Sequence, residues 1–273
     1  MSPVQAVRFG RQLGSFLYHV IPIRRRVAFE NLQHAFPDKN TRQINRIIKR
    51  TYQNFGQTFT DFLRTPVRTK KELQQRVRMK NVNVLNRVMQ NPKGVVFLSG
   101  HYGNWEIMAA AISAHGCPLT VLARTQRNKR VDALVNSYRK IAGIETFPLG
   151  LAVRAVLRTL RAGRAVALLA DQDAHKEGIF VPFFGRPAAT APGPALFILK
   201  TGAPFIFAEC KIDRNGGYSV WFTPIKTQDL DGISQENIKT LTRRHVKLLE
   251  EKIRLRPDHW FWMHKRWKTK PSN

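Results

Sequence analysis

The chain has 273 residues, of which 43% are hydrophobic, so it can bury a substantial core and is not a disordered polypeptide. Its 46 Lys and Arg outnumber its 18 Asp and Glu, which gives a formal net charge of +28. A surface this basic favours phosphates, acidic proteins or an anionic membrane as partners. Cys117 and Cys210 lie far apart without a CxxC motif, and we expect buried thiols in a reducing compartment rather than a disulfide or a zinc site.

The first 90 residues are the most basic part of the chain, with 18 Lys or Arg and 4 Asp or Glu, half of the net charge. The apolar residues from position 25 to 89 recur at helical spacing, which predicts a run of helices. The stretch VQAVRFGRQLGSFLYHVIPI (residues 4–23) is interrupted by Arg8 and Arg11. It is therefore neither a bilayer-spanning helix nor a signal peptide.

An amphipathic segment in the membrane interface fits residues 4–23 better, with the two arginines toward headgroups. The apolar side would comprise Phe9, Leu13, Phe16 and Leu17. A core helix of a basic protein is the alternative reading.

After Pro92 the pattern changes to short apolar runs separated by Gly and Pro, which predicts buried strands. The runs are GVVFLSG, PLTVLA, ETFPLG, AVALLAD, IFVPFFG, APFIFAECKI and YSVWFTP. Helical patterns at 104–115, 129–142 and 151–163 alternate with them, and another follows at 235–255. We expect one α/β domain over 1–273: a largely parallel mixed sheet of about seven strands flanked by helices (91–273), with a helical, membrane-facing N-terminal cap (1–90).

The segment LSGHYGNWEI (residues 98–107) contains the clearest candidate for catalysis. His101 follows a predicted strand, Gly100 and Gly103 permit a sharp turn, and Asn104 is a good N-cap for the next helix. This geometry would bring Glu106, in the first helical turn, to the imidazole. A carboxylate on one imidazole nitrogen leaves the other free to accept a proton, so the pair predicts general-base catalysis at the carboxyl edge of the sheet.

The spacing H-x4-E also occurs at His245 and Glu250. Five residues of an uninterrupted helix correspond to about 500°, so these two side chains point about 140° apart. We expect no cooperation between them. The chain has no G-x-S-x-G motif, and neither cysteine has an activating partner, so the nucleophile should be a hydroxyl of the substrate.

Four segments carry a family resemblance: RRRVAFENLQHAFPD, GHYGNWE, LLADQDAHKEGIFVPFFGRPAAT and FWMHKRWK. Together they cover most of the chain, and it resembles the bacterial lipid A biosynthesis (late lauroyl/myristoyl) acyltransferases, H-x4-[DE] enzymes to which the mycobacterial phosphatidylinositol mannoside acyltransferases are related. The resemblance implies a glycerolipid acyltransferase-like fold and no cofactor or metal. It further implies a bacterial inner-membrane enzyme of lipopolysaccharide biosynthesis that moves a fatty acyl chain from acyl carrier protein or coenzyme A to a glycolipid hydroxyl.

The same resemblance implies roles for individual residues. His101 would be the base, Glu106 its partner and Arg139 a further catalytic group. Asn104, Arg124 and Asp171 would contact substrate. Asp171 ends the strand AVALLA on the predicted edge that carries His101, so we expect it near the site.

The family's usual N-terminal transmembrane anchor is missing or shortened in residues 1–23, which favours peripheral or monotopic attachment to the cytoplasmic face of the inner membrane. An anionic membrane surface and an acidic carrier protein would both be attracted by the basic charge. The segment FFGRPAATAPGPALFILKTGA is a candidate wall for an acyl chain, with a plain core helix as the alternative.

Three other functions are compatible with parts of the pattern. A phosphatidylinositol mannoside or another lipid could be the acceptor. A metal-dependent glycosyltransferase could use Asp171 and Asp173 of the DQD tripeptide. A nucleic-acid-binding protein would share the charge, but no nucleic-acid-binding module is recognisable, and we expect no nucleic-acid partner.

Overall fold

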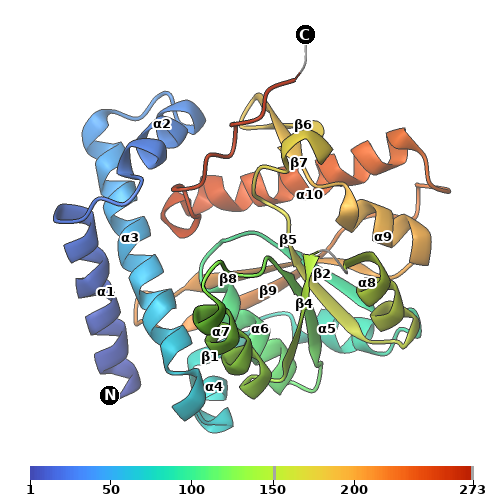
Figure 1. The fold of residues 1–273 in the computed structure, drawn as a ribbon, viewed down its shortest axis with the longest axis horizontal. Coiled ribbons are helices and arrows are strands. Elements are labelled where there is room, and N and C mark those ends of the chain that lie inside the picture. Colours follow the sequence, from blue (N-terminus) through green and yellow to red (C-terminus); the bar gives the residue numbers. More distant parts are fainter. Residues whose placement is uncertain (150–151, 272–273) are drawn as a thin grey trace.

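The computed structural model describes residues 1–149 and 152–271, and the predicted start of a helix at residue 151 lies outside them. The N-terminal part is helical, as predicted, and its described helices stand on one side of the molecule or beneath it (Figure 1). They are α1 (Pro3–His19), α2 (Arg25–Ala35), α3 (Thr41–Leu63), α4 (Lys70–Arg76) and α5 (Val82–Met89), with a 3-10 turn η1 (Thr65–Val67).

A seven-stranded mixed sheet forms the centre of the described chain, in the order β1-β9-β8-β2-β5-β3-β4. All neighbouring pairs run parallel except β8 and β9. The strands are β1 (Val77–Met79), β2 (Val95–Ser99), β3 (Leu119–Ala123), β4 (Ile144–Pro148), β5 (Ala165–Leu169), β8 (Phe205–Ile212) and β9 (Tyr218–Pro224). The predicted largely parallel α/β sheet is thereby confirmed.

Alternating side chains of the central strands serve two different cores. Val96 and Leu98 of β2 face the core that includes the C-terminal tail, whereas Val95 and Phe97 face the core that includes α6. The helices of this half are α6 (Trp105–Ala114), α7 (Lys129–Ile141), α8 (Ala152–Arg161), α9 (Gly193–Thr201) and α10 (Gln235–Leu255), with 3-10 turns η3 (His175–Glu177) and η4 (Pro257–His259). Because both faces are covered, the strands read as continuous apolar runs.

One predicted strand is in a different place. The run IFVPFFG forms β6 (Ile179–Phe183), which pairs with β7 (Arg186–Thr190) in a separate two-stranded antiparallel sheet. The turn between them has Phe184 and Gly185 at positive φ. An apolar run alone does not distinguish a hairpin covered by a helix from a central strand. The seventh strand of the main sheet is instead β1, which lies inside the stretch that the periodicity assigned to helices.

Helix α1 packs closely along α3 through glycines. A Cβ atom on Gly10, Gly14 or Gly56 would lie 2.1 to 2.4 Å from an atom of the other helix, so only glycine permits this approach. The two helices lie side by side at the edge of the molecule (Figure 1), and the outer side of α1 is exposed. No helix of the described ranges is both long and apolar enough to cross a bilayer.

Candidate active site

A tight turn joins β2 to α6 and carries His101. Gly103 has φ +62°, and a Cβ atom there would lie 1.7 Å from the carbonyl oxygen of Cys210, so glycine is required for both reasons. Asn104 caps α6, its side-chain oxygen accepting a hydrogen bond from the backbone N–H of Ile107 at 3.0 Å. The predicted strand, glycine turn and N-cap are confirmed.

The imidazole of His101 contacts the carboxylate of Asp171. Its Nδ1 lies 2.8 Å from Asp171 Oδ1, and the backbone N–H of His101 donates to Oδ2, also at 2.8 Å. Strands β2 and β5 are parallel neighbours with Ser99 opposite Leu169, so both residues leave the carboxyl edge together, as expected for Asp171. A proton on Nδ1, bonded to the carboxylate, leaves Nε2 as the basic nitrogen.

The two ionisable groups of this pair differ in exposure. The side chain of Asp171 is 3% exposed and that of His101 is 23% exposed. Burial alone would raise the pKa of Asp171, but the charge and hydrogen bonds of His101, with a hydrogen bond from Trp260, lower it to about 2. Burial opposes protonation of His101, but Asp171 and, more weakly, Glu106 raise its pKa above 6.5. The arrangement stabilises an imidazolium beside a permanent carboxylate.

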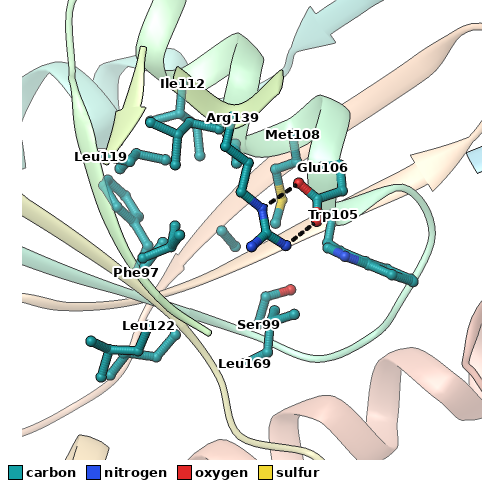
Figure 2. Close-up of a pocket in the computed structure, with 16 residues that line it drawn as sticks. Phe97, Ser99, Trp105, Glu106, Met108, Ile112, Leu119, Leu122, Arg139 and Leu169 are labelled. Carbon is teal, nitrogen blue, oxygen red and sulfur yellow. Dashed lines mark hydrogen bonds and ion pairs between the residues drawn. The ribbon is translucent and has the colours of Figure 1, made fainter. Parts of the chain in front are cut away.

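Glu106 forms an ion pair with Arg139 of α7. Arg139 Nη2 donates to Oε1 at 2.6 Å and Nε donates to Oε2 at 3.3 Å, and both side chains are 17% exposed (Figure 2). No hydrogen bond joins Glu106 to His101 in the described ranges. The expected direct contact is replaced by two pairs, because the first turn of α6 directs Glu106 toward α7 and Asp171 already occupies Nδ1.

An apolar pocket lies beside the Glu106–Arg139 pair (Figure 2). Its cavity volume is about 70 Å³, and α6, α7 and the central strands form its walls. The lining residues are Phe97, Ser99, Trp105, Glu106, Met108, Ala109, Ile112, Leu119, Val121, Leu122, Arg139, Ile144, Ala167, Leu168, Leu169 and Ala208. None belongs to FFGRPAATAPGPALFILKTGA, the segment predicted as a wall, which instead forms the β6–β7 turn, β7 and α9.

A shallow depression of about 10 Å³ exposes His101 on the side of α3. Phe55 of α3 and Phe261 of the C-terminal tail line it, and Trp105 lines both this depression and the apolar pocket. The rings of His101 and Trp105 meet edge to face, with centroids 4.9 Å apart. His101 therefore stands between an apolar pocket and an opening toward the N-terminal helices.

Two further predicted site residues lie in contrasting surroundings. Asn104 is fully buried, and its amide nitrogen donates to the hydroxyl of Tyr218 at 3.2 Å. Both of its side-chain groups are thus bonded within the protein. Arg124 follows the end of β3 and is exposed, where it is accessible to a ligand. Their contact with substrate stays a prediction.

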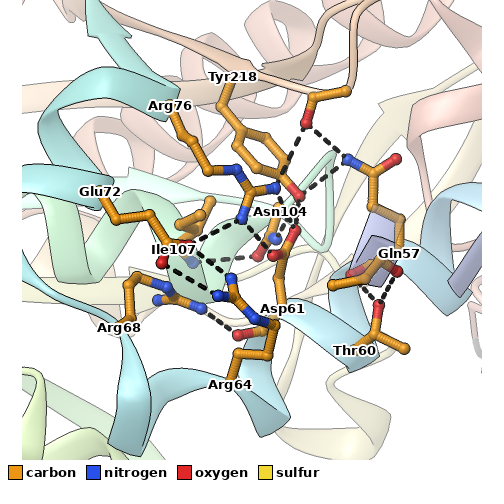
Figure 3. A network of polar contacts seen from close by, with 12 residues as sticks. Gln57, Thr60, Asp61, Arg64, Arg68, Glu72, Arg76, Asn104, Ile107 and Tyr218 are labelled. Carbon is orange, nitrogen blue, oxygen red and sulfur yellow. Dashed lines mark hydrogen bonds and ion pairs between the residues drawn. The ribbon is translucent and has the colours of Figure 1, made fainter. Parts of the chain in front are cut away.

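A buried polar network ties α3 to the base of this turn (Figure 3). Asp61 is fully buried and pairs with Arg76 at 2.6 and 3.1 Å. Tyr218 donates its hydroxyl hydrogen to Asp61 and accepts from Gln57 and Asn104. A buried network of this kind holds its members in one arrangement, and it links α3 to Asn104 at the N-terminus of α6. Sequence reasoning missed it because its members are far apart in the chain.

The two aspartates of the DQD tripeptide have separate partners. Asp171 bonds His101 and Trp260, whereas Asp173 accepts from the hydroxyl of Thr269 at 2.8 Å and lies 3.2 Å from Nδ1 of His175. Across residues 1–149 and 152–271, no three His, Cys, Asp or Glu side chains gather as metal ligands. Asp171 is thus held beside His101, and Asp173 beside Thr269 and His175.

The second H-x4-E pair behaves as predicted. Glu250 bonds Arg254 and the backbone N–H of Phe184. His245 is buried, packs edge to face against Phe205, and its Nε2 has no hydrogen-bond partner in the described part of the chain. Burial and the charge of Arg266 lower the pKa of His245 to about 3. It is a neutral core histidine.

His101 lies at the carboxyl edge of an α/β sheet, beside an apolar pocket. This arrangement is typical of enzymes that act on a substrate with an apolar part. Comparison with known families is more specific. Residues 1–269 match the Bacterial lipid A biosynthesis acyltransferase family, and the chain belongs to this family of acyltransferases.

Individual relatives are distant. The chain is 24% identical to a phosphatidylinositol mannoside acyltransferase of Mycobacterium tuberculosis over 79% of this chain and 68% of that protein. It is 28% identical to a lipid A biosynthesis acyltransferase of Haemophilus influenzae over 67% and 58%, respectively. It is 23% identical to the lipid A biosynthesis myristoyltransferase of Escherichia coli over 95% and 80%.

Proposed function

We propose that this protein transfers a fatty acyl chain from an acyl thioester to a hydroxyl of a bacterial glycolipid, with a lipid A precursor as the first candidate. The observation that carries the proposal is the His101–Asp171 pair, which holds a basic nitrogen at the sheet edge between an apolar pocket and an open depression. The lipid A acyltransferases among its relatives support the choice of acceptor. The mycobacterial relative favours a phosphatidylinositol mannoside as the second candidate.

His101 acts as the general base in this proposal. Its Nε2 removes the proton of the acceptor hydroxyl as the oxygen attacks the thioester carbonyl, and Asp171 stabilises the imidazolium that forms. The tetrahedral intermediate then collapses, the carbon–sulfur bond breaks, and the thiolate leaves with the proton from His101. The products are an ester and a free thiol, and no other reactant is required.

Arg139 stabilises negative charge near the reacting carbonyl. Its Nε and Nη2 bind Glu106, and Nη1 has no hydrogen-bond partner in residues 1–149 and 152–271. A guanidinium held by a carboxylate on one side presents its remaining donors in a fixed direction. Glu106 therefore acts chiefly through Arg139, and its charge also favours the imidazolium of His101.

The apolar pocket is the proposed site for the acyl chain, because its lining is almost entirely aliphatic and aromatic and its polar end is the Glu106–Arg139 pair. The acceptor would approach through the depression beside α3. Either acyl carrier protein or acyl coenzyme A can serve as donor. Both are anionic, and a protein of net charge +28 attracts both.

The outer side of α1 is the proposed membrane contact. Large apolar side chains are exposed on α1, on the segment that follows it and on α3: Val4, Phe9, Phe16, Val20, Ile21, Ile23, Phe59 and Leu63. Arg8, Arg11 and Arg24 are exposed beside them. Of the predicted apolar face, Phe9 and Phe16 are exposed while Leu13 and Leu17 are half-buried. Exposed apolar and basic side chains on one helix suit the interface of an anionic bilayer.

Flotation with vesicles of phosphatidylethanolamine and phosphatidylglycerol tests this membrane contact. We expect the native chain to float with the vesicles and Phe9→Glu/Phe16→Glu to stay in solution. Val153→Glu/Ile233→Glu is the matched control, because it places two carboxylates on exposed apolar positions of α8 and of the loop before α10. Equal flotation of the two double variants would contradict a contact through α1.

Mass spectrometry of the glycolipids of cells with and without the gene tests the function. We expect an acceptor one acyl chain lighter when the gene is removed, restored by the native gene and not by His101→Ala. The mass difference identifies both the chain and the acceptor, which separates a lipid A precursor from a phosphatidylinositol mannoside. An unchanged glycolipid profile would refute the proposal.

A further inference from the structure

The C-terminal tail pairs directly with the turn that carries His101. The backbone N–H of Phe261 donates to the carbonyl oxygen of His101 at 3.0 Å, and the N–H of Gly103 donates to that of His259 at 2.8 Å. Between them, Tyr102 and Trp260 form an isolated antiparallel bridge. The tail thus continues the carboxyl edge of the sheet around the catalytic turn, although about 160 residues of chain separate the two segments.

The indole of Trp260 also contacts the carboxylate behind His101. Trp260 is 1% exposed, and its Nε1–H donates to Oδ2 of Asp171 at 2.8 Å. The same oxygen accepts from the backbone N–H of His101. These two donors fix Oδ2, and a planar carboxylate fixed at one oxygen has its other oxygen fixed as well. Oδ1 is then directed at the imidazole.

We propose that Trp260 is a positioning residue for catalysis, which aims Asp171 at His101 through the indole N–H. This inference rests on the proposed function and extends it to the C-terminal tail, where Trp260 immediately precedes the segment FWMHKRWK (residues 261–268). Titratable groups of three elements face the pair: Glu106 on α6, Arg139 on α7, and His264 and Arg266 on the tail. None of these four donates a hydrogen bond to Asp171 in the described ranges.

Removing the indole N–H changes the pair in two ways. The carboxylate of Asp171 loses one of the two donors that set its angle, while the backbone N–H of His101 still holds it within reach of the ring, so the fraction of enzyme with a correctly oriented imidazole falls. The carboxylate also loses a donor that disperses its negative charge, and the charge acts more strongly on His101. The imidazolium is then stabilised relative to the neutral base, so His101 titrates at higher pH.

Trp262 provides a matched control. It is fully buried in the same tail, and its Nε1–H donates to the carbonyl oxygen of Pro257 at 2.7 Å rather than to Asp171. Its ring meets that of Trp260 edge to face with centroids 4.7 Å apart. Trp262→Phe therefore removes an equivalent indole, with equivalent packing and one hydrogen bond, from the same core.

The experiment is an NMR titration of ring-labelled histidine in the full chain, with the His101 signal assigned by its loss in His101→Gln. We expect the midpoint of His101 to move upward in Trp260→Phe and to stay at its native value in Trp262→Phe. In the acyl transfer assay, Trp260→Phe should lower kcat about ten- to hundredfold, the effect of one hydrogen bond to a charged group, with KM nearly unchanged. Coincident titrations of the native chain and Trp260→Phe would overturn the inference.

A shape-preserving replacement covers the case in which Trp260→Phe does not fold. Benzothienylalanine at position 260 keeps the bicyclic ring and replaces the N–H with sulfur, so packing is retained while the donor is lost. The same upward shift is expected, and a native midpoint would refute the role. Because the titration does not depend on turnover, a shifted midpoint without acyl transfer would refute the proposed function and leave the positioning role intact.

Discussion

Asp171→Asn separates the role of Asp171 from that of Glu106. Besides the imidazole, two groups donate to Asp171: the backbone N–H of His101 and the Nε1–H of Trp260. Both donate to Oδ2, each at 2.8 Å. An asparagine at this position therefore places its carbonyl oxygen at Oδ2 and its NH2 group at Oδ1, facing Nδ1 of the imidazole. The NH2 group then donates to Nδ1, so the neutral imidazole carries its proton on Nε2 instead. In this tautomer Nε2 cannot accept a proton from the acceptor hydroxyl.

The same exchange in a serine protease triad lowers kcat about 10⁴-fold, and we expect a loss of about 10³- to 10⁴-fold here, or about 4–5.5 kcal/mol of transition-state stabilisation. The acid limb of the pH–rate profile should also move. Burial opposes the imidazolium while the charge of Asp171 favours it. Without that charge the pKa of His101 falls, so the limb moves to lower pH.

Glu106→Gln is the matched control, because it replaces a carboxylate that contacts Arg139 rather than the imidazole of His101. We expect a smaller loss of activity, about tenfold to a hundredfold, and an acid limb closer to that of the native enzyme. The assay is transfer of a radiolabelled acyl chain from acyl carrier protein, with kcat measured between pH 5 and 9. A Glu106→Gln variant that is more damaged than Asp171→Asn, with the larger limb shift, would refute the reasoning.

Three further predictions concern the turn, the buried histidine and the pocket. Gly103→Ala should lower the free energy of unfolding by about 2–4 kcal/mol, because it combines positive φ with a clash against Cys210. Urea unfolding checks this against Gly185→Ala, which has positive φ but open space, and equal losses would contradict it. Native stability should fall as pH drops from 6.5 toward 3, because unfolding lets His245, whose pKa burial lowers to about 3, take up a proton. In His245→Leu the fall should be smaller, with kcat retained, and an unchanged pH dependence of unfolding would argue against a neutral buried histidine. Ala167→Leu fills part of the apolar pocket and should shift the preferred donor to shorter acyl chains in a competition assay, whereas an unchanged preference would place the chain elsewhere.

Local signals carried most of the sequence-based predictions. The order of strand, glycine turn and N-cap around His101 was predictable because the positive φ of Gly103 and the cap that Asn104 forms on Ile107 are local backbone features. The parallel sheet was predictable because strands covered on both faces are apolar throughout. The inert pair His245 and Glu250 followed from helix geometry alone.

Long-range partners were harder to predict. Asp171 was placed at the correct edge from strand adjacency, but its hydrogen bond to His101 depends on side-chain direction across 70 residues of chain. Spacing favoured Glu106 instead, since the nearest carboxylate in sequence is the simplest candidate. The indole donor of Trp260 and the Asp61–Tyr218 network gave no periodic or motif signal, because each forms only when distant segments fold together.

The apolar pocket and the β6–β7 hairpin show the limit of reading apolar runs. Small and apolar residues in FFGRPAATAPGPALFILKTGA fitted a binding wall as well as a packed core, and only the arrangement in space distinguishes them. The pocket is formed where α6 and α7 approach β2, β3 and β5. Its lining residues come from seven different elements, so no continuous stretch of sequence identifies it.

The measurement closest to the central claim is acyl transfer with purified components. The protein would be incubated with a radiolabelled acyl thioester of acyl carrier protein and a lipid A precursor that lacks one secondary acyl chain, and the lipid product would be separated and counted. The account predicts a labelled ester with the native protein, His245→Leu retaining native activity, and His101→Ala losing at least a hundredfold. Equal activity of His101→Ala and the native protein would contradict it.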